Sequence, residues 1–329
     1  MEEKRSSAVY AAGHFLVDLA CAFALLRFVR GTAAWGEAAL LYNFLAFAGQ
    51  LPLGLLADRL GDGRRFAAAG CVLCAGSFVL TGTPTALAVL AGVGNALYHV
   101  GGGLDTLNRA AGKAGPLGVF VAPGAVGLLL GAVLARSACP AVLPPLLLLL
   151  TAAAVAGLCA RTENAPLSLA LPGTAAAALG ALFLAVCLRS YAGFLFAFPW
   201  RTGVWAWAFV LCVALGKAAG GLALDRLGLS RTAVPSLGLA AALFLVSDRP
   251  LWGCLAVLLF NMTMPVTLHA AAERLPGAKG FSFGLLTFAL FLGFLPEFFG
   301  LPALRTGWMY ALLSLATLAL LVPAGRRRA

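Results

Sequence analysis

The chain has 329 residues, of which 62% are hydrophobic and only 11% are charged, and its formal net charge is +11. A soluble domain carries about a quarter of its residues as charged side chains, so this composition excludes a soluble enzyme and requires lipid as the solvent for much of the surface. The apolar runs are about twenty residues long, which favours membrane-spanning helices over the alternating strands of a barrel.

Twelve such apolar runs follow one another, each long enough to cross a bilayer as a helix. Because the connections between them are short, we expect no soluble domain, no long lid and no central linker. The predicted spans cover residues 8–29, 35–56, 66–83, 85–106, 115–135, 140–160, 172–197, 203–224, 231–247, 250–271, 280–299 and 307–324. The sequence therefore predicts an all-α membrane protein of twelve transmembrane helices.

The basic residues predict the orientation of these helices. With a cytoplasmic N-terminus, fifteen of the 23 Lys and Arg residues fall inside and six fall outside, while Arg189 and Lys217 lie within spans. Cytoplasmic loops collect positive charge, so we expect an integral protein of a bacterial inner (plasma) membrane with both termini in the cytoplasm. The same rule explains the net charge without a nucleic-acid partner. The inside set is Lys4, Arg5, Arg59, Arg64, Arg65, Arg109, Lys113, Arg161, Arg226, Arg231, Arg274, Lys279, Arg326, Arg327 and Arg328.

A short segment at the end of the second span recurs at the end of the eighth. Both copies read Gly-x3-Asp-Arg-Leu-Gly, at Gly54–Gly61 and at Gly221–Gly228. Asn95 in the fourth span corresponds to Asn261 in the tenth by a similar alignment. Internal repeats of this kind are typical of transporter folds, so we expect two pseudo-symmetric six-helix bundles, at 1–162 and 163–329.

The first copy continues into a basic pair and resembles the signature loop of the major facilitator superfamily, with its second copy where that superfamily repeats the loop. The resemblance implies the major-facilitator fold and a secondary transporter in which two bundles rock about a central cavity. It also implies that the loop is a conformational latch, since an Asp at a helix end can engage backbone donors in one state and release them in the other. The latch residues are Gly54, Asp58, Arg59, Gly61, Arg64, Arg65, Gly221, Asp225 and Arg226.

A finer resemblance, to the fosmidomycin-resistance-like branch of drug and metabolite exporters, rests on polar residues in three spans. These are His14-x3-Asp18, Asn95-x3-His99 and Arg189-Ser190. This resemblance implies export of a small organic solute.

The same polar groups are candidate functional residues because charges inside a membrane are costly. Asp18 lies near the middle of the first span and His14 lies one turn earlier on the same face, so together they could carry a proton. The alternative is a static polar patch that joins helices. Arg189 aligns with Asp18 when the two halves are overlaid, and the two residues either pair directly or lie apart.

The remaining candidates are in spans four, seven and ten. Asn95 and His99, one turn apart, either bind solute or bond neighbouring helices. Tyr191 and Asn261 complete the predicted solute and proton pathway. We expect Lys217 to snorkel to the inner surface and Asp105 to be solvated at the cytoplasmic end.

The sequence contains no nucleotide-binding, HExxH or recognisable Ser-His-Asp pattern, so we expect no catalytic site, no cofactor and no metal. We predict a monomeric, lipid-embedded and proton-coupled exporter of a small organic solute. The open alternatives are a uniporter, an anion antiporter organised around Arg189, and a receptor that keeps the fold without flux. A further alternative is a polytopic enzyme that acts on a lipid-linked substrate through His14, Asp18 and His99.

Overall fold

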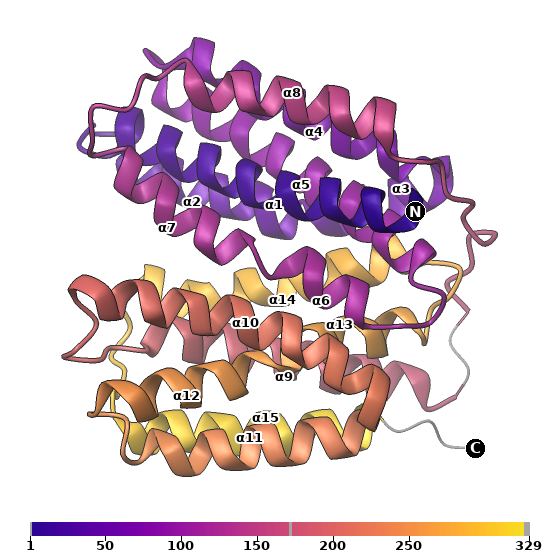
Figure 1. The fold of residues 1–329 in the computed structure, drawn as a ribbon, viewed down its shortest axis with the longest axis vertical. Helices are drawn as coiled ribbons and strands as arrows, with labels where there is room; N and C mark the ends of the chain where they lie inside the picture. Colours follow the sequence, from indigo (N-terminus) through magenta and orange to yellow (C-terminus); the bar gives the residue numbers. More distant parts are fainter. Residues whose placement is uncertain (1, 171–172, 326–329) are drawn as a thin grey trace.

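The computed structural model describes residues 2–170 and 173–325, and this part of the chain is almost entirely helical (Figure 1). The first half contains α1 (Glu2–Ala24), η1 (Leu25–Val29), α2 (Trp35–Asn43), η2 (Phe44–Ala48), α3 (Gln50–Leu60), α4 (Gly63–Gly76), η3 (Ser77–Leu80), α5 (Pro84–Arg109), α6 (Gly115–Val121), α7 (Gly124–Leu134) and α8 (Leu143–Leu158). The second half contains α9 (Ala175–Leu195), α10 (Gly203–Leu227), α11 (Leu229–Phe244), α12 (Pro250–Asn261), α13 (Thr263–Ala272), α14 (Lys279–Phe298) and α15 (Gly307–Gly325).

Ten helical spans among the described residues are long and apolar enough to cross a membrane. The helices α8 and α11 are apolar but shorter, with 16 residues each. Together they account for the twelve predicted spans, so the prediction of a twelve-helix membrane fold is confirmed.

The first span begins earlier than predicted. Helix α1 starts at Glu2 rather than near residue 8, so the basic residues Lys4 and Arg5 lie on the helix. Hydropathy detects only the apolar part of a helix, whereas Glu, Lys and Arg are good helix formers and the two acidic residues in the first turn suit the positive end of the helix dipole.

Three of the spans are interrupted. The second contains the π-helical turn η2, the fifth breaks between α6 and α7 at Pro123, and the tenth breaks between α12 and α13 at Met262. Proline has no backbone N–H to donate, which explains the break at Pro123. These interruptions lie within the membrane-crossing spans Trp35–Leu60, Gly115–Leu134 and Pro250–Ala272.

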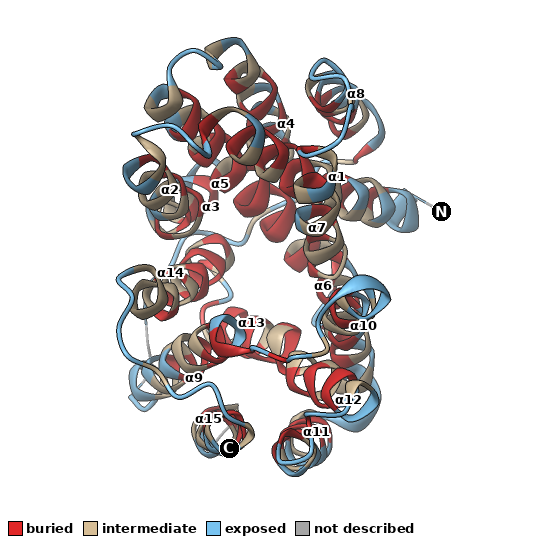
Figure 2. Ribbon diagram, turned by 90° about the vertical axis from the view of Figure 1, so that its left-hand side faces the viewer, coloured by how far each residue is buried: buried red, intermediate tan, exposed pale blue. Residues whose placement is uncertain are grey.

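The helices form two bundles that lie one above the other in Figure 1, α1–α8 above and α9–α15 below. Helices α3 and α5–α7 of the first bundle pack against α10, α13 and α14 of the second. Figure 2 shows buried residues turned toward the inside of each bundle and exposed ones around its outside. The exposed residues include large apolar side chains on α8, α11 and α15, among them Leu150, Leu239 and Leu312, as expected for helices in contact with lipid.

The expectation of no central linker is wrong. Residues 160–170, between the bundles, form no helix and cross one end of the first bundle. The Asn164 amide donates to the carbonyls of Ala57 and Asp58 at 3.3 and 3.4 Å and accepts from Asn108 at 2.6 Å. Polar side chains therefore hold this segment against the helix ends, and an apolar periodicity cannot reveal such contacts.

Candidate functional site

The two bundles are joined at the end of the molecule where α1 begins and α15 ends, which we call the terminal end. There the Asp58 carboxylate, on α3, accepts the backbone N–H groups of Gly280 at 2.8 Å and Phe281 at 2.7 Å. These N–H groups belong to the first turn of α14, in the other bundle. Helix N-termini have unpaired donors and a positive dipole end, so a carboxylate stabilises them strongly.

The second copy of the loop makes the same contact in the opposite direction. Asp225, on α10, accepts the N–H groups of Ala114 at 2.6 Å and Gly115 at 2.8 Å. Gly115 opens α6 in the first bundle. Each bundle therefore caps a helix of the other, and the internal repeat of the sequence becomes a pair of reciprocal contacts.

Glycines allow the backbones to approach at these contacts. A Cβ atom on Gly54 would lie 2.2 Å from the carbonyl oxygen of Gly280. In the second copy, a Cβ on Gly221 would lie 2.5 Å from the carbonyl oxygen of Ala114. Because the obstructing atoms are backbone, neither position accepts a side chain while the bundles remain closed at this end.

The other residues of the loop act within their own bundles. Gly61 ends α3 with a positive φ of 70°, a conformation that favours glycine. Arg64 donates to the carbonyls of Ala156 and Cys159, at the end of α8. Arg65 pairs with Asp62 at 3.0 Å, while Arg59 and Arg226 are exposed. Among the predicted latch residues, the two aspartates and the two close-packed glycines make the contact between bundles.

A buried polar cluster lies in the first bundle, between α1 and α5. Asp18 Oδ2 lies 3.3 Å from His14 Nε2, and Asp18 Oδ1 lies 3.7 Å from His99 Nε2. The His14 and His99 Nε2 atoms are 3.1 Å apart. The Asn95 amide donates to Asp18 Oδ1 at 3.3 Å and to the Tyr42 hydroxyl at 3.2 Å. The structure therefore brings four of the predicted site residues together and adds Tyr42.

Helical spacing brings together the two residues of each pair, and the packing of two helices brings the two pairs together. The pairs His14–Asp18 and Asn95–His99 are each one turn apart, so each shares a helix face. Their meeting depends on the close packing of α1 against α5. Gly124, at the start of α7, is also needed, since a Cβ there would lie 2.3 Å from His14 Nε2 and 2.4 Å from Asp18 Oδ2.

Arg189 does not pair with Asp18. Its side chain is buried, with 7% relative exposure, and its Nε atom has no hydrogen-bond partner. The recorded partners of Asp18 are His14, His99 and Asn95. The structure therefore resolves the open question about this pair, because α9 belongs to the other bundle and the carboxylate is already engaged by its own bundle.

The expectation that Lys217 snorkels is wrong. This half-buried side chain interacts electrostatically with Asp18 in the first bundle and with Arg189 in its own. Its backbone carbonyl also faces Gly118 of α6 across the interface. Lys217 therefore faces the other bundle, on the side of Asp18, rather than the inner surface at which the sequence predicted it.

Two further candidates lie apart from the cluster. The Asn261 amide donates to the carbonyl of Val257 on its own helix, at 2.8 Å, whereas its repeat partner Asn95 bonds to another helix. Tyr191 is half-buried and interacts electrostatically with Arg305, at the end opposite the terminal end. Neither residue contacts the cluster directly in this structure.

Asp105 is buried rather than solvated as expected, with 1% relative exposure. It accepts the hydroxyl of Tyr10 at 2.5 Å and that of Thr162 at 2.7 Å, and it lies 3.6 Å from Arg109. The carboxylate joins α1, α5 and the segment between the bundles. Its position at the end of an apolar run suggested exposure because the sequence does not show which side chains cover that end.

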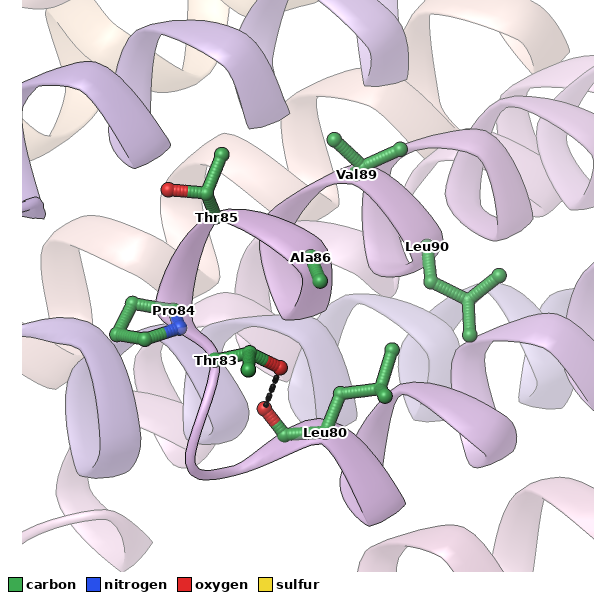
Figure 3. A pocket seen from close by; sticks show the side chains of 7 residues that line it. All are labelled: Leu80, Thr83, Pro84, Thr85, Ala86, Val89 and Leu90. Carbon is green, nitrogen blue, oxygen red and sulfur yellow. Dashed lines mark hydrogen bonds between the residues drawn. The ribbon is translucent and has the colours of Figure 1, made fainter.

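A surface hollow lies away from this cluster. It has a volume of about 700 Å³ and lies at the opposite end, around the start of α5 (Figure 3). Seven residues line it, and none of them is charged: Leu80, Thr83, Pro84, Thr85, Ala86, Val89 and Leu90. It includes none of the predicted site residues, so the polar cluster between α1 and α5 remains the candidate site.

No family model matches the chain, and no curated protein sequence matches it. Solved structures do match along nearly the whole length. The E. coli fucose:proton symporter FucP, described as a major facilitator superfamily transporter, is 13% identical with a TM-score of 0.70, and the match covers 98% of both chains. The chain therefore has the major-facilitator fold.

Two other transporters with this fold are similar to the chain. The human organic anion transporter MFSD10 is 16% identical with a TM-score of 0.71, over 97% of this chain and 99% of that one. A bacterial homologue of the iron transporter ferroportin, in an outward-facing state, is 16% identical with a TM-score of 0.62, over 97% of both chains. These matches confirm the major-facilitator fold, while the finer resemblance to the fosmidomycin-resistance-like branch stays a prediction.

Proposed function

We propose that the protein is a secondary transporter that moves a small solute by alternating access. The observation that carries the proposal is the reciprocal capping of α14 by Asp58 and of α6 by Asp225. The hydrogen bonds described between residues 2–162 and 173–325 all lie at the terminal end, so release of these caps would let the bundles part there. Transporters with the major-facilitator fold include the fucose:proton symporter and the organic anion transporter to which the chain is similar.

The terminal end faces the cytoplasm in this proposal. The support is the excess of Lys and Arg in the loops and helix ends on that side, twelve of the described residues against six at the other end. The predicted inside residues Arg326, Arg327 and Arg328 lie outside the described residues. The closed contact at the terminal end then corresponds to a state with access from outside. Export as the direction of transport, and action as a monomer, follow from the family resemblance alone.

The His14–Asp18–His99 cluster is proposed to carry the coupling proton. It combines a carboxylate and two imidazoles inside a membrane-spanning bundle, and ionisable side chains in such positions are typical of proton relays. Asp18 lies ten residues after the start of the apolar run at residue 8 and eleven before Val29, where η1 ends, so the cluster is proposed to lie near the middle of the membrane, where access alternates.

Asp18→Asn is expected to abolish solute flux driven by a pH gradient in proteoliposomes. The amide keeps the shape of the side chain but cannot hold the negative charge that attracts the proton. Exchange of solute without a gradient should continue, because the fold and the latch remain. The solute would first be found by a thermal-shift screen of small organic acids, sugars and amines. Gradient-driven flux equal to that of the wild type would exclude the coupling role of Asp18.

An organic anion is the solute class that the second bundle favours. Arg189 is buried, its Nε atom has no hydrogen-bond partner, and no ion pair to it is found within residues 2–170 and 173–325; Lys217 adds a second positive charge near it. Buried charges are usually paired, so two neighbouring cations are suited to hold a carboxylate or phosphonate. Uniport or anion antiport on the same fold are the alternatives, and flux that does not depend on a pH gradient would favour them.

Arg189→Met is expected to raise the melting temperature in detergent, because it removes a buried charge for which the described residues provide no ion pair. Replacing even buried ion pairs with apolar residues is often neutral or stabilises proteins by about 1–4 kcal/mol. The same variant should lose the thermal stabilisation produced by an organic anion. Arg305→Met is a suitable control, since Arg305 is exposed and pairs with Glu297 at 2.6 Å. A lower melting temperature in Arg189→Met, with the anion response kept, would show that Arg189 has a structural role.

A further inference from the structure

Three side chains of the buried cluster are of the types that bind metal ions. His14 Nε2, His99 Nε2 and an oxygen of Asp18 all lie within 4.8 Å of one another. They come from α1 and α5, so no single segment of the sequence has metal-ligand spacing. The set of two imidazole nitrogens and one carboxylate oxygen is suited to zinc and to similar divalent transition metals.

We propose that His14, Asp18 and His99 form a binding site for a divalent transition-metal cation such as Zn²⁺ or Co²⁺. The geometry supports this step. Ligand bonds of about 2.0–2.1 Å in a tetrahedral site place neighbouring ligand atoms about 3.3–3.4 Å apart. The two Nε2 atoms are 3.1 Å apart, His14 Nε2 lies 3.3 Å from Asp18 Oδ2 and His99 Nε2 lies 3.7 Å from Asp18 Oδ1. With a single Asp18 oxygen, the three ligand atoms lie within 4.8 Å of one another. An ion can therefore be held by these three side chains with small movements of their ends.

The orientation of His99 also suits a metal ligand. Its Nδ1 atom lies 2.8 Å from the carbonyl oxygen of Asn95, and a carbonyl oxygen only accepts. Nδ1 therefore carries the hydrogen, and the lone pair of Nε2 points toward His14 and Asp18. Imidazoles that bind metals are commonly held in this way, with the second nitrogen donating to a carbonyl or carboxylate. The amide of Asn95 also donates to Asp18 Oδ1, at 3.3 Å.

The three side chains are largely buried but not completely covered. The side chains of His14, Asp18 and His99 keep relative exposures of 8%, 12% and 11%. Gly124 faces the His14–Asp18 pair with no side chain, and a Cβ there would lie within 2.4 Å of both. Three protein ligands leave a coordination position for water or an anionic solute.

The charge that faces the cluster from the other bundle is positive. Lys217, on α10, interacts electrostatically with Asp18 and His99, and Arg189 lies near Lys217. In the closed state the positive charge of Lys217 repels a bound cation and weakens its binding. When the bundles part, Lys217 moves away from the cluster and the repulsion falls. We therefore expect Lys217→Met to bind the ion several-fold more tightly than the wild type.

A buried thiol pair one turn from Asp18 is the rival metal site. Cys21 Sγ and Cys74 Sγ are 3.7 Å apart, and thiolates also bind zinc. The two sites are distinguished by their ligands, because cobalt bound to thiolate has an intense near-ultraviolet charge-transfer band that cobalt bound to nitrogen and oxygen lacks.

The test uses the full-length protein, without a histidine tag, in detergent and free of chelators. Titration with ZnCl₂ in a calorimeter should show one ion per chain, and CoCl₂ should give visible bands of tetrahedral cobalt without the thiolate band. His99→Gln and His14→Gln should weaken binding at least about 100-fold, and Asn95→Ala about tenfold, in line with the effect of groups that orient ligands. The double variant Cys21→Ala/Cys74→Ala should bind as the wild type does.

Several outcomes would overturn the site. These are no binding of either metal to the wild type, binding that persists in both histidine variants, or binding that is lost with the two thiols. The cobalt spectrum of the wild type decides between the sites even where a histidine variant fails to fold. Because the readout is binding in detergent, the result does not depend on whether the protein transports a solute.

Discussion

Asp58→Asn opens the terminal end of the molecule and increases hydrogen exchange at the first turn of α14. The carboxylate of Asp58 accepts two backbone N–H groups from the other bundle, at 2.8 and 2.7 Å. Hydrogen bonds to a charged group are worth about 1.5–3 kcal/mol each. The neutral side-chain oxygen of the substituted asparagine would keep only part of this free energy. We therefore expect a loss of about 2–3 kcal/mol, equivalent to about 30- to 150-fold faster exchange at Gly280 and Phe281, measured by mass spectrometry.

Hydrogen exchange at the second contact between the bundles, the one made by Asp225, decides what this experiment means. If the bundles part as rigid bodies, exchange should also rise at Ala114 and Gly115, which Asp225 caps and which the substitution does not touch. Asp62→Asn is the matched control, because Asp62 caps α4 within its own bundle by accepting Arg65 N–H at 3.0 Å. A rise confined to Gly280 and Phe281 would mean local fraying of α14, and it would contradict the latch.

Gly54→Ala prevents the closed contact from forming. The added Cβ would lie 2.2 Å from the carbonyl oxygen and 2.6 Å from the carbonyl carbon of Gly280. These are backbone atoms, so the bundles must separate to relieve the overlap, and the capping by Asp58 one turn later is lost as well. The cost of overpacking is commonly about 1–3 kcal/mol, and together with the lost cap we expect the closed state to lose about 100-fold or more in population.

Spin labels at two exposed positions of the terminal end measure this opening. Arg59 and Arg226 lie in different bundles and are both exposed, so their replacement by labelled cysteines in a cysteine-free background should leave the contact intact. Pulsed electron resonance should show a longer and broader distance distribution in Gly54→Ala than in the parent. Gly180→Ala is the control, since nothing lies within 4 Å of a Cβ at that position. An unchanged distribution in Gly54→Ala would show that closure does not require the glycine.

Much of the architecture could be predicted because it follows from local composition. The twelve spans appear as apolar runs, since lipid requires each crossing segment to satisfy its own backbone and to present apolar side chains. Helix ends were less certain. The polar start of α1 at Glu2 lies outside the apolar run, so hydropathy placed this helix end incorrectly. The gap after the sixth span was predicted, but the packing of residues 160–170 against the helix ends was not.

The candidate site could be predicted only in pieces. The pairs His14–Asp18 and Asn95–His99 follow from a helical period of 3.6 residues. Their approach to within 3.1 Å depends on the packing of α1 against α5 and on the missing side chain of Gly124. Tyr42 and Lys217 approach the polar cluster from α2 and α10. The periodicity of a sequence does not show which face of a helix is directed toward a helix far away in the chain.

The sequence alone determined the number of spans, the duplication of the signature loop and the short list of polar residues inside the membrane. These features depend on composition and on neighbours along the chain. Only the tertiary structure decided what the residues contact. It showed that Asp58 and Asp225 cap helices of the opposite bundle, that Asp18 is engaged by two histidines rather than by Arg189, and that Asp105 is buried. Such contacts join segments far apart in the chain, and their geometry depends on close packing that no local pattern records.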